Sequence, residues 1–268
     1  MKRIIDFFIF LLIIRTSLLL PIIKISFVSK ILVSILPTIF SIYLFLKNKK
    51  LFVPSLFFTI NALCSPFIFI IIEKNKLYIP QINFFIPIVI YLLIIFFIKD
   101  LKKEINWLEI GEFNKTTLIL IVILICCSCT ALLFWALVIE TNLLQFQKYI
   151  PKIPLALLLL YGLIFPILNS LFEEFMARAV LFDGFSALFE KIVFVIILQA
   201  IIFALWHYKG FPGGIIGVIM VFIWSLFLGI IRYKSKGMLP PLVAHFFADL
   251  TIAIILFFII ILPNKLWI

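Results

Sequence analysis

Long apolar segments, separated by short basic or polar connections, run through the whole sequence. A helix that crosses about 30 Å of hydrocarbon needs about 20 residues. Segments of roughly this length lie at residues 4–22, 30–46, 51–72, 81–98, 116–139, 154–182, 192–208, 214–232 and 239–262. A β-barrel would instead show short segments of alternating polarity. The pattern therefore predicts an all-α fold, a polytopic transmembrane helical bundle of about eight or nine spans, the first interrupted by Arg15.

Composition and charge agree with a membrane location. The 268 residues are 66% hydrophobic and 13% charged, whereas a soluble domain is about half apolar and about a quarter charged. The net charge is +11, but the basic residues lie in short connections, where the positive-inside rule places them. We therefore expect a multi-pass protein in contact with the lipid bilayer and no nucleic-acid partner. The Phe-, Ile- and Lys-rich composition suggests a low-GC genome, and hence a bacterial plasma membrane.

One polar connection divides the chain. The segment 99–115, KDLKKEINWLEIGEFNK, mixes apolar residues with charges, which predicts a short interfacial helix. Residues 1–115 are then N-terminal transmembrane spans and an interfacial loop. Residues 116–268 carry nearly all of the intramembrane polar side chains and form the predicted catalytic core.

The cysteines lie in apolar runs, which predicts packing in the core. Two of them form a CxxC in the middle of a span, without the second pair that a metal site would need. We therefore expect no metal or redox chemistry from Cys64, Cys126, Cys127 and Cys129.

The stretch LFEEFMARAVLFDG, residues 171–184, places Glu173, Glu174 and Arg178 at the end of an otherwise apolar helix. Each costs roughly 2.5–3.5 kcal/mol at the centre of a bilayer, so the group needs a functional or structural reason. Glu174 and Arg178 are four residues apart and can pair on one helix face. Glu173 points about 100° away from them and has no local partner. An unpaired carboxylate in a dry environment is either protonated or functional.

Two later segments add the chemistry that a hydrolase needs. Phe203 and His207 are four residues apart in FALWH, and His245 and Asp249 are four apart in HFFAD. A glutamate and a neutral histidine that converge on one water can remove its proton and direct it at a carbonyl carbon. A second histidine can then donate to the oxyanion. There is no GxSxG motif to suggest a serine nucleophile.

A metal site is the alternative that the same residues allow. Glu173, His207 and His245 offer one oxygen and two nitrogens, which suits zinc with an open coordination position. The HExxH spacing of a metalloprotease helix is absent, so the three ligands would come from three helices.

The motifs EEFMAR (173–178), FALWH (203–207) and HFFAD (245–249) match the patterns EExxxR, FxxxH and HxxxN/D in that order. They resemble the three motifs of the CAAX protease and bacteriocin-processing family, also called the CPBP or Abi family. This family includes the Ras-converting type of prenyl-protein endopeptidase. The resemblance covers about residues 116–262. It implies an all-helical bundle with a conical cavity that takes the C-terminal region of a substrate.

The resemblance also implies roles for individual residues. Glu173 matches the glutamate that activates water, and His207 matches the histidine that shares this task. His245 and Asp249 match the pair proposed to stabilise the oxyanion. Prenyl-protein endopeptidases carry Asn at the last position, and an ionised Asp cannot donate a hydrogen bond. Asp249 would have to be protonated, or would orient His245 instead. The supporting positions are Glu174, Arg178 and Phe203.

We therefore expect an intramembrane endopeptidase of glutamate type that needs no metal or other cofactor. Its partner would be a hydrophobic or membrane-associated peptide or protein, and a bacterial source would favour an unprenylated one. Two alternatives stay open. One is a zinc-dependent membrane protease, and the other is a non-catalytic membrane protein of the same fold, a bacteriocin-immunity factor or a scaffold.

Overall fold

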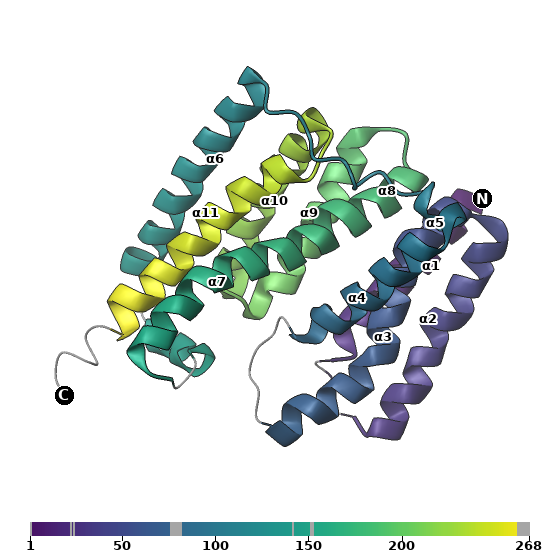
Figure 1. Ribbon diagram of the computed structural model, residues 1–268, viewed down its shortest axis with the longest axis horizontal. Coiled ribbons are helices and arrows are strands. Elements are labelled where there is room, and N and C mark those ends of the chain that lie inside the picture. Colours follow the sequence, from purple (N-terminus) through teal and green to yellow (C-terminus); the bar gives the residue numbers. More distant parts are fainter. Residues whose placement is uncertain are drawn as a thin grey trace. The chain divides into compact units, whose positions relative to one another are not determined.

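A computed structural model describes residues 2–21, 23, 25–75, 82–140, 142–150 and 153–261. These residues form helices joined by short connections, without strands in the described part (Figure 1). The α-helices are α1 (Lys2–Leu19), α2 (Phe27–Lys47), α3 (Lys49–Asn75), α4 (Ile82–Phe97), α5 (Lys99–Lys102), α6 (Lys115–Phe134), α7 (Leu155–Glu174), α8 (Phe182–Leu188), α9 (Ile192–Trp206), α10 (Gly214–Ser235) and α11 (Leu239–Ile255).

Short helices of other types complete the list. The π-helical segments are η1 (Trp135–Ile139), η3 (Phe175–Leu181) and η5 (Leu256–Ile261), and the 3₁₀ turns are η2 (Leu143–Tyr149) and η4 (His207–Lys209). Each of the nine predicted apolar segments coincides with a helix, which confirms the all-α prediction.

Seven helices of the described part are long and apolar enough to cross a membrane, in rough agreement with the predicted eight or nine spans. Helix α1 carries Lys2, Arg3, Asp6 and Arg15, too many charges for this group. The apolar part of α4, Phe84–Phe97, is shorter than the others. The chain is thus a multi-pass membrane protein by the length and composition of its helices.

The chain forms two compact units, which we describe separately. Unit 1 comprises residues 1–107 and 179–195, and unit 2 comprises residues 108–178 and 196–268. In unit 1, α8 packs against α1 and α3. Phe10 of α1 makes edge contacts with Phe58 of α3 and Phe185 of α8. Gly184 leaves the space that the Phe10 ring fills, because a Cβ there would lie 2.3 Å from the ring.

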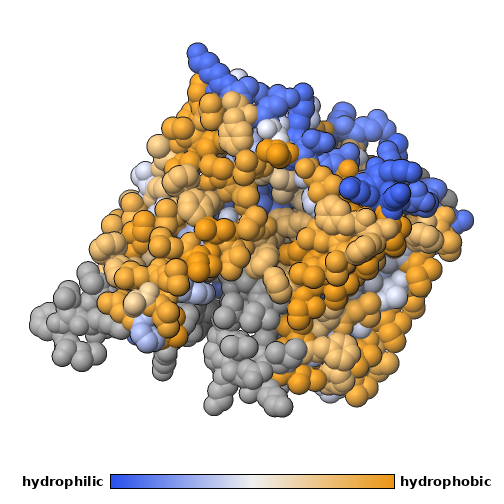
Figure 2. All heavy atoms as spheres, in the orientation of Figure 1, coloured by the Kyte–Doolittle hydropathy of each residue, from blue (hydrophilic) through white to orange (hydrophobic). Residues whose placement is uncertain are grey.

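Unit 2 is built around α11, which lies between α6 and α7 and also contacts α10 (Figure 1). Apolar residues of α6, α10 and α11 form one of its cores, among them Leu124, Leu228 and Ala244. Figure 2 shows hydrophilic residues concentrated where α6 and α11 begin and α10 ends, with apolar side chains along the helices. This pattern is the one expected of helices that cross lipid.

Two local predictions hold only in part. The helix predicted within 99–115 is limited to α5, and residues 105–114 are not helical, because their backbone serves other contacts. The carbonyls of Glu109 and Ile110 accept from the amides of Met238 and Leu239 at 2.9 Å, which satisfies donors at the start of α11. Cys126 and Cys127 are exposed rather than packed in the core. The buried face of α6 carries Ile121, Leu124, Ser128 and Leu132, and the two cysteines lie off it.

Candidate active site

The two glutamates stand at the end of α7, where the helix passes into the π-helical turn η3. Such π segments occur often at functional sites. The side chain of Glu174 is 1% exposed, whereas that of Glu173 is 13% exposed. Adjacent residues on one helix therefore present one carboxylate to the interior of unit 2 and one toward an accessible edge.

Glu174 pairs with Arg178, as the four-residue spacing predicts. The Nη1 of Arg178 lies 3.0 Å from Oε1 of Glu174, and the arginine side chain is fully buried. Its Nη2 donates to the hydroxyl of Ser225 at 2.9 Å. The guanidinium also lies 4.7 Å from the ring centre of Phe203, within cation–π range. The arginine thus neutralises Glu174 and connects α7 to α9 and α10.

His245 reaches this pair from α11. Its Nδ1 lies 2.7 Å from Oε1 of Glu174. Because Arg178 holds Glu174 as an acceptor, Nδ1 is the donor in this bond. The other ring nitrogen, Nε2, lies 3.4 Å from Oε2 of Glu173 and 3.5 Å from Oδ2 of Asp249. The buried pair therefore fixes the ring so that Nε2 faces Glu173.

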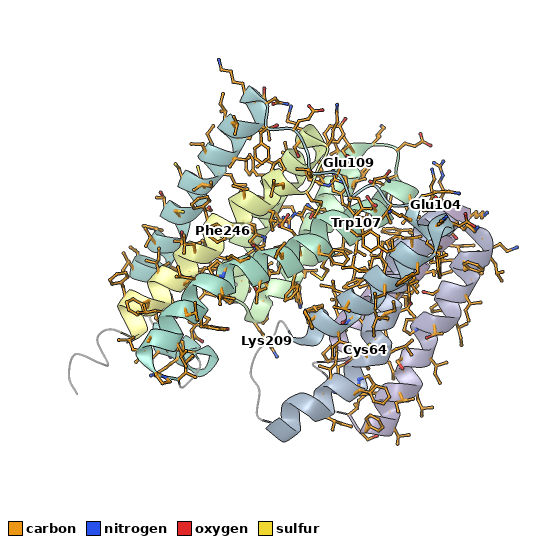
Figure 3. The ribbon with its side chains drawn as sticks, in the orientation of Figure 1. Cys64, Glu104, Trp107, Glu109, Lys209 and Phe246 are labelled. Atoms are coloured by element: carbon orange, nitrogen blue, oxygen red, sulfur yellow. The ribbon has the colours of Figure 1, made fainter. Side chains whose placement is uncertain are left out.

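His207 approaches Glu173 from the end of α9. It begins the turn η4, two residues before Lys209 (Figure 3). Its Nδ1 lies 2.9 Å from the carbonyl oxygen of Phe203, which can only accept, so Nδ1 donates. Its Nε2 lies 3.3 Å from Oε2 of Glu173. The Phe203 ring, 4.4 Å away between centroids, packs against the imidazole and limits its rotation.

Both imidazoles therefore direct Nε2 at the same oxygen, Oε2 of Glu173. The side chain of His207 is 13% exposed, like that of Glu173, while those of His245 and Asp249 are 2% and 4% exposed. Glu173 and His207 form the accessible edge of this cluster, and the other members form its buried wall. Glu173 and His207 are therefore the members of the cluster best placed to meet a water molecule.

Asn169 belongs to the cluster and was missed from the sequence. Its Nδ2 donates to Oδ2 of Asp249 at 3.1 Å, which joins α7 to α11. A signal was present, because Asn169 stands one turn before Glu173 on the same face of an apolar helix. An amide within a membrane span is unusual enough to mark the position.

Gln199 and Ser225 also support the site from outside the three motifs. The amide of Gln199 donates to the carbonyl oxygen of Ser225 at 3.1 Å, and both residues are fully buried. The Ser225 hydroxyl accepts from Arg178. Ser225 therefore helps to hold Arg178 in place. An arginine beside its hydroxyl is not a base that could activate it as a nucleophile.

A comparison with protein families points to the same part of the chain. Residues 154–251 match the family model described as Type II CAAX prenyl endopeptidase Rce1-like. This segment is similar to that family. The resemblance inferred from the three motifs is thereby confirmed. No curated protein and no solved structure gives a significant match to the chain.

The Rce1-like segment contains every residue of the cluster, from Asn169 on α7 to Asp249 on α11. It also contains Ser225 and Gln199. The part of the chain that matches a protease family is therefore the part that collects the buried acids and imidazoles.

We also asked whether the same side chains fit a metal ion. Among the described residues, no group of three or more His, Cys, Asp and Glu side chains is arranged to hold one. The Nε2 atoms of His207 and His245 lie 3.3 and 3.4 Å from Oε2 of Glu173, so these three possible ligand atoms contact one another. The geometry gives the zinc alternative no support of its own, and we derive no step through a metal.

Proposed function

We propose that the chain is an intramembrane endopeptidase of glutamate type. One observation carries this proposal: Oε2 of Glu173 lies 3.3 Å from Nε2 of His207 and 3.4 Å from Nε2 of His245, at the accessible edge of a buried cluster. A carboxylate beside two imidazoles in a water-poor site can provide general acid–base catalysis of attack on a carbonyl group. The Rce1-like match over 154–251 favours a peptide bond as the target.

In the reaction we propose, a water molecule binds at the accessible edge of the cluster, within reach of both Glu173 and His207. Glu173 removes a proton from this water while its oxygen attacks the carbonyl carbon of the peptide bond. The carbonyl π electrons move onto the carbonyl oxygen, which becomes the oxyanion. The carbon–nitrogen bond then breaks as the departing nitrogen takes up the proton from Glu173. The products are one peptide with a new carboxyl group and one with a new amine.

His245 supports the oxyanion in this scheme. Its Nδ1–H already donates to Glu174, so a hydrogen bond to the oxyanion must be donated by Nε2–H. Glu174 then balances the charge of the imidazolium, and Arg178 holds Glu174 in place. A preorganised donor of this kind contributes about 10²–10³ to kcat. Phe203 contributes by orienting His207 through its carbonyl oxygen and its ring.

The substrate that we propose is a hydrophobic or membrane-associated peptide. The matched family is described as a CAAX prenyl endopeptidase, so a farnesylated peptide with a C-terminal CAAX sequence is one probe. The same peptide without the farnesyl group is its matched partner. Comparison of the two tells whether the lipid is recognised.

The test uses the purified full chain in liposomes with both peptides, and mass spectrometry identifies the products. We expect cleavage by the wild type, and a loss of about 10²-fold or more in rate for Glu173→Gln and for His207→Ala. Cleavage should survive chelators. Stoichiometric zinc together with chelator-sensitive cleavage would favour the zinc-dependent alternative. A wild type that cleaves neither peptide, with bacteriocin immunity that survives Glu173→Gln, would favour the non-catalytic alternative.

A further inference from the structure

One oxygen in the cluster has two nitrogen atoms directed at it. Oδ2 of Asp249 lies 3.1 Å from Nδ2 of Asn169 and 3.5 Å from Nε2 of His245. The two nitrogens come from different helices, α7 and α11. The Asn169 amide donates to this oxygen, and because Asp249 is almost fully buried, bulk water has little access to it.

Two converging donors around one oxygen are what a peptide carbonyl needs when negative charge develops on it. A carboxylate oxygen and an oxyanion have the same donor requirements, since both carry negative charge and only accept. The Asp249 oxygen therefore marks a position where an oxyanion would be stabilised. It lies next to Glu173, because His245 Nε2 is 3.4 Å from the Glu173 carboxylate.

Asn169 stands on the correct face for this role. It precedes Glu173 by four residues, so the amide and the carboxylate lie one above the other on α7. An amide N–H is a donor at any pH, whereas an ionised Asp249 can only accept. While Asp249 is ionised, Asn169 is therefore the member of this pair that can donate to an oxyanion.

We propose that Asn169 is a catalytic residue, the amide donor of the oxyanion site, and that Asp249 is the positioning residue that holds this amide in the resting protein. The inference rests on the proposed peptidase function. On substrate binding, the carbonyl oxygen takes the place of Asp249 Oδ2 between Asn169 Nδ2 and His245 Nε2. No atom or electron is added to the reaction given above, since Asn169 supplies a hydrogen bond alone.

The experiment compares four proteins with the farnesylated and unfarnesylated peptides: wild type, Asn169→Ala, Asn169→Asp and the exchange Asn169→Asp with Asp249→Asn. Asparagine and aspartate have the same shape, so the exchange keeps the α7–α11 bond and reverses its polarity. We expect kcat of Asn169→Ala to fall about 10²–10³-fold with KM within threefold of the wild type. Asn169→Asp should lose at least as much, and the exchange should recover at least tenfold over Asn169→Asp.

Ser170→Ala is the matched control. Its hydroxyl donates to the carbonyl oxygen of Ile167 within α7, away from the cluster, so the kcat of this variant should stay within threefold of the wild type. Thermal unfolding and size-exclusion profiles show whether each variant is folded, and the exchange variant restores the bond if Asn169→Ala is unstable.

The outcomes separate the two proposals. A folded Asn169→Ala with wild-type kcat, or an exchange variant no more active than Asn169→Asp, overturns the role of Asn169. Either result leaves the peptidase function in place, provided that the wild type cleaves and Glu173→Gln does not. If wild type and Glu173→Gln are equally inactive, the proposed function itself fails, and the inference fails with it.

Discussion

Replacement of Arg178 by leucine removes the guanidinium that pairs with Glu174. The partners are 0% and 1% exposed, so the remaining carboxylate would stay in a low-dielectric interior without this cation. Breaking one side of a buried ion pair costs about 3–5 kcal/mol. At roughly 2–4 °C per kcal/mol, this corresponds to about 6–20 °C in Tm. We expect Arg178→Leu to unfold that much earlier than the wild type.

A second substitution tests the cause. Glu174→Gln removes the charge but keeps an oxygen that can accept from Nδ1 of His245. Because the uncompensated charge is the main part of the loss, the double variant should be more stable than Arg178→Leu, by about 2 kcal/mol. A second substitution in a buried cluster usually lowers stability further. A double variant that is more stable than Arg178→Leu would therefore point to the uncompensated charge as the cause.

The assay is thermal unfolding in one detergent, followed by tryptophan fluorescence and size-exclusion chromatography. Arg3→Leu is the matched control, because Arg3 also forms a pair, with Glu190 at 2.8 Å, but at 73% and 80% exposure. An exposed pair contributes about 0–1 kcal/mol, so the control should change Tm little. A double variant no more stable than Arg178→Leu, or an Arg178→Leu that resembles Arg3→Leu, would refute the reasoning.

Two further predictions concern packing. A Cβ on Gly237 would lie 2.1 Å from the amide nitrogen of Gly111, so Gly237→Ala should cost about 1–3 kcal/mol. Gly162→Ala meets nothing within 4 Å and should be neutral or stabilising by up to about 1 kcal/mol; equal Tm shifts for the two would contradict this. Phe203→Leu keeps the backbone carbonyl that accepts from His207 but loses the ring that packs against the imidazole. The cation–π and ring contacts are worth about 1 kcal/mol. We therefore expect kcat to fall by about tenfold or less and KM to stay unchanged. A kcat equal to that of the wild type would show that the ring does not orient His207.

Much of the fold follows from segment length and polarity. The predicted helices are present because an apolar segment in lipid must satisfy its backbone internally, and a helix does so within the segment. The Glu174–Arg178 contact was also predictable, since it depends only on helix geometry. Glu173 was identifiable because its carboxylate had no local partner.

The spatial part of the site could not be predicted in the same way. Which face of α7 meets α11 depends on the rotation of both helices, and the Asn169–Asp249 bond follows from that rotation. The depth of His207 was likewise open, because the segment 192–208 does not show where in the membrane its helix ends. The positions of Cys126 and Cys127 could not be predicted either, because apolar residues surround a cysteine in the sequence whether it faces lipid or the core.

The three carboxylates of the cluster need positive charge or protons to balance them. Glu173, Glu174 and Asp249 offer only acceptors when ionised, and Arg178 balances one of the three.

Each imidazole has its Nδ1–H committed, one to Glu174 and one to the carbonyl oxygen of Phe203. The only ring positions left for additional protons are the two Nε2 atoms, and both face Glu173. The protons that can balance the buried acids are therefore located where a hydrolytic reaction would use them. A network with this property couples the stability of the helices to the protonation of the reacting groups.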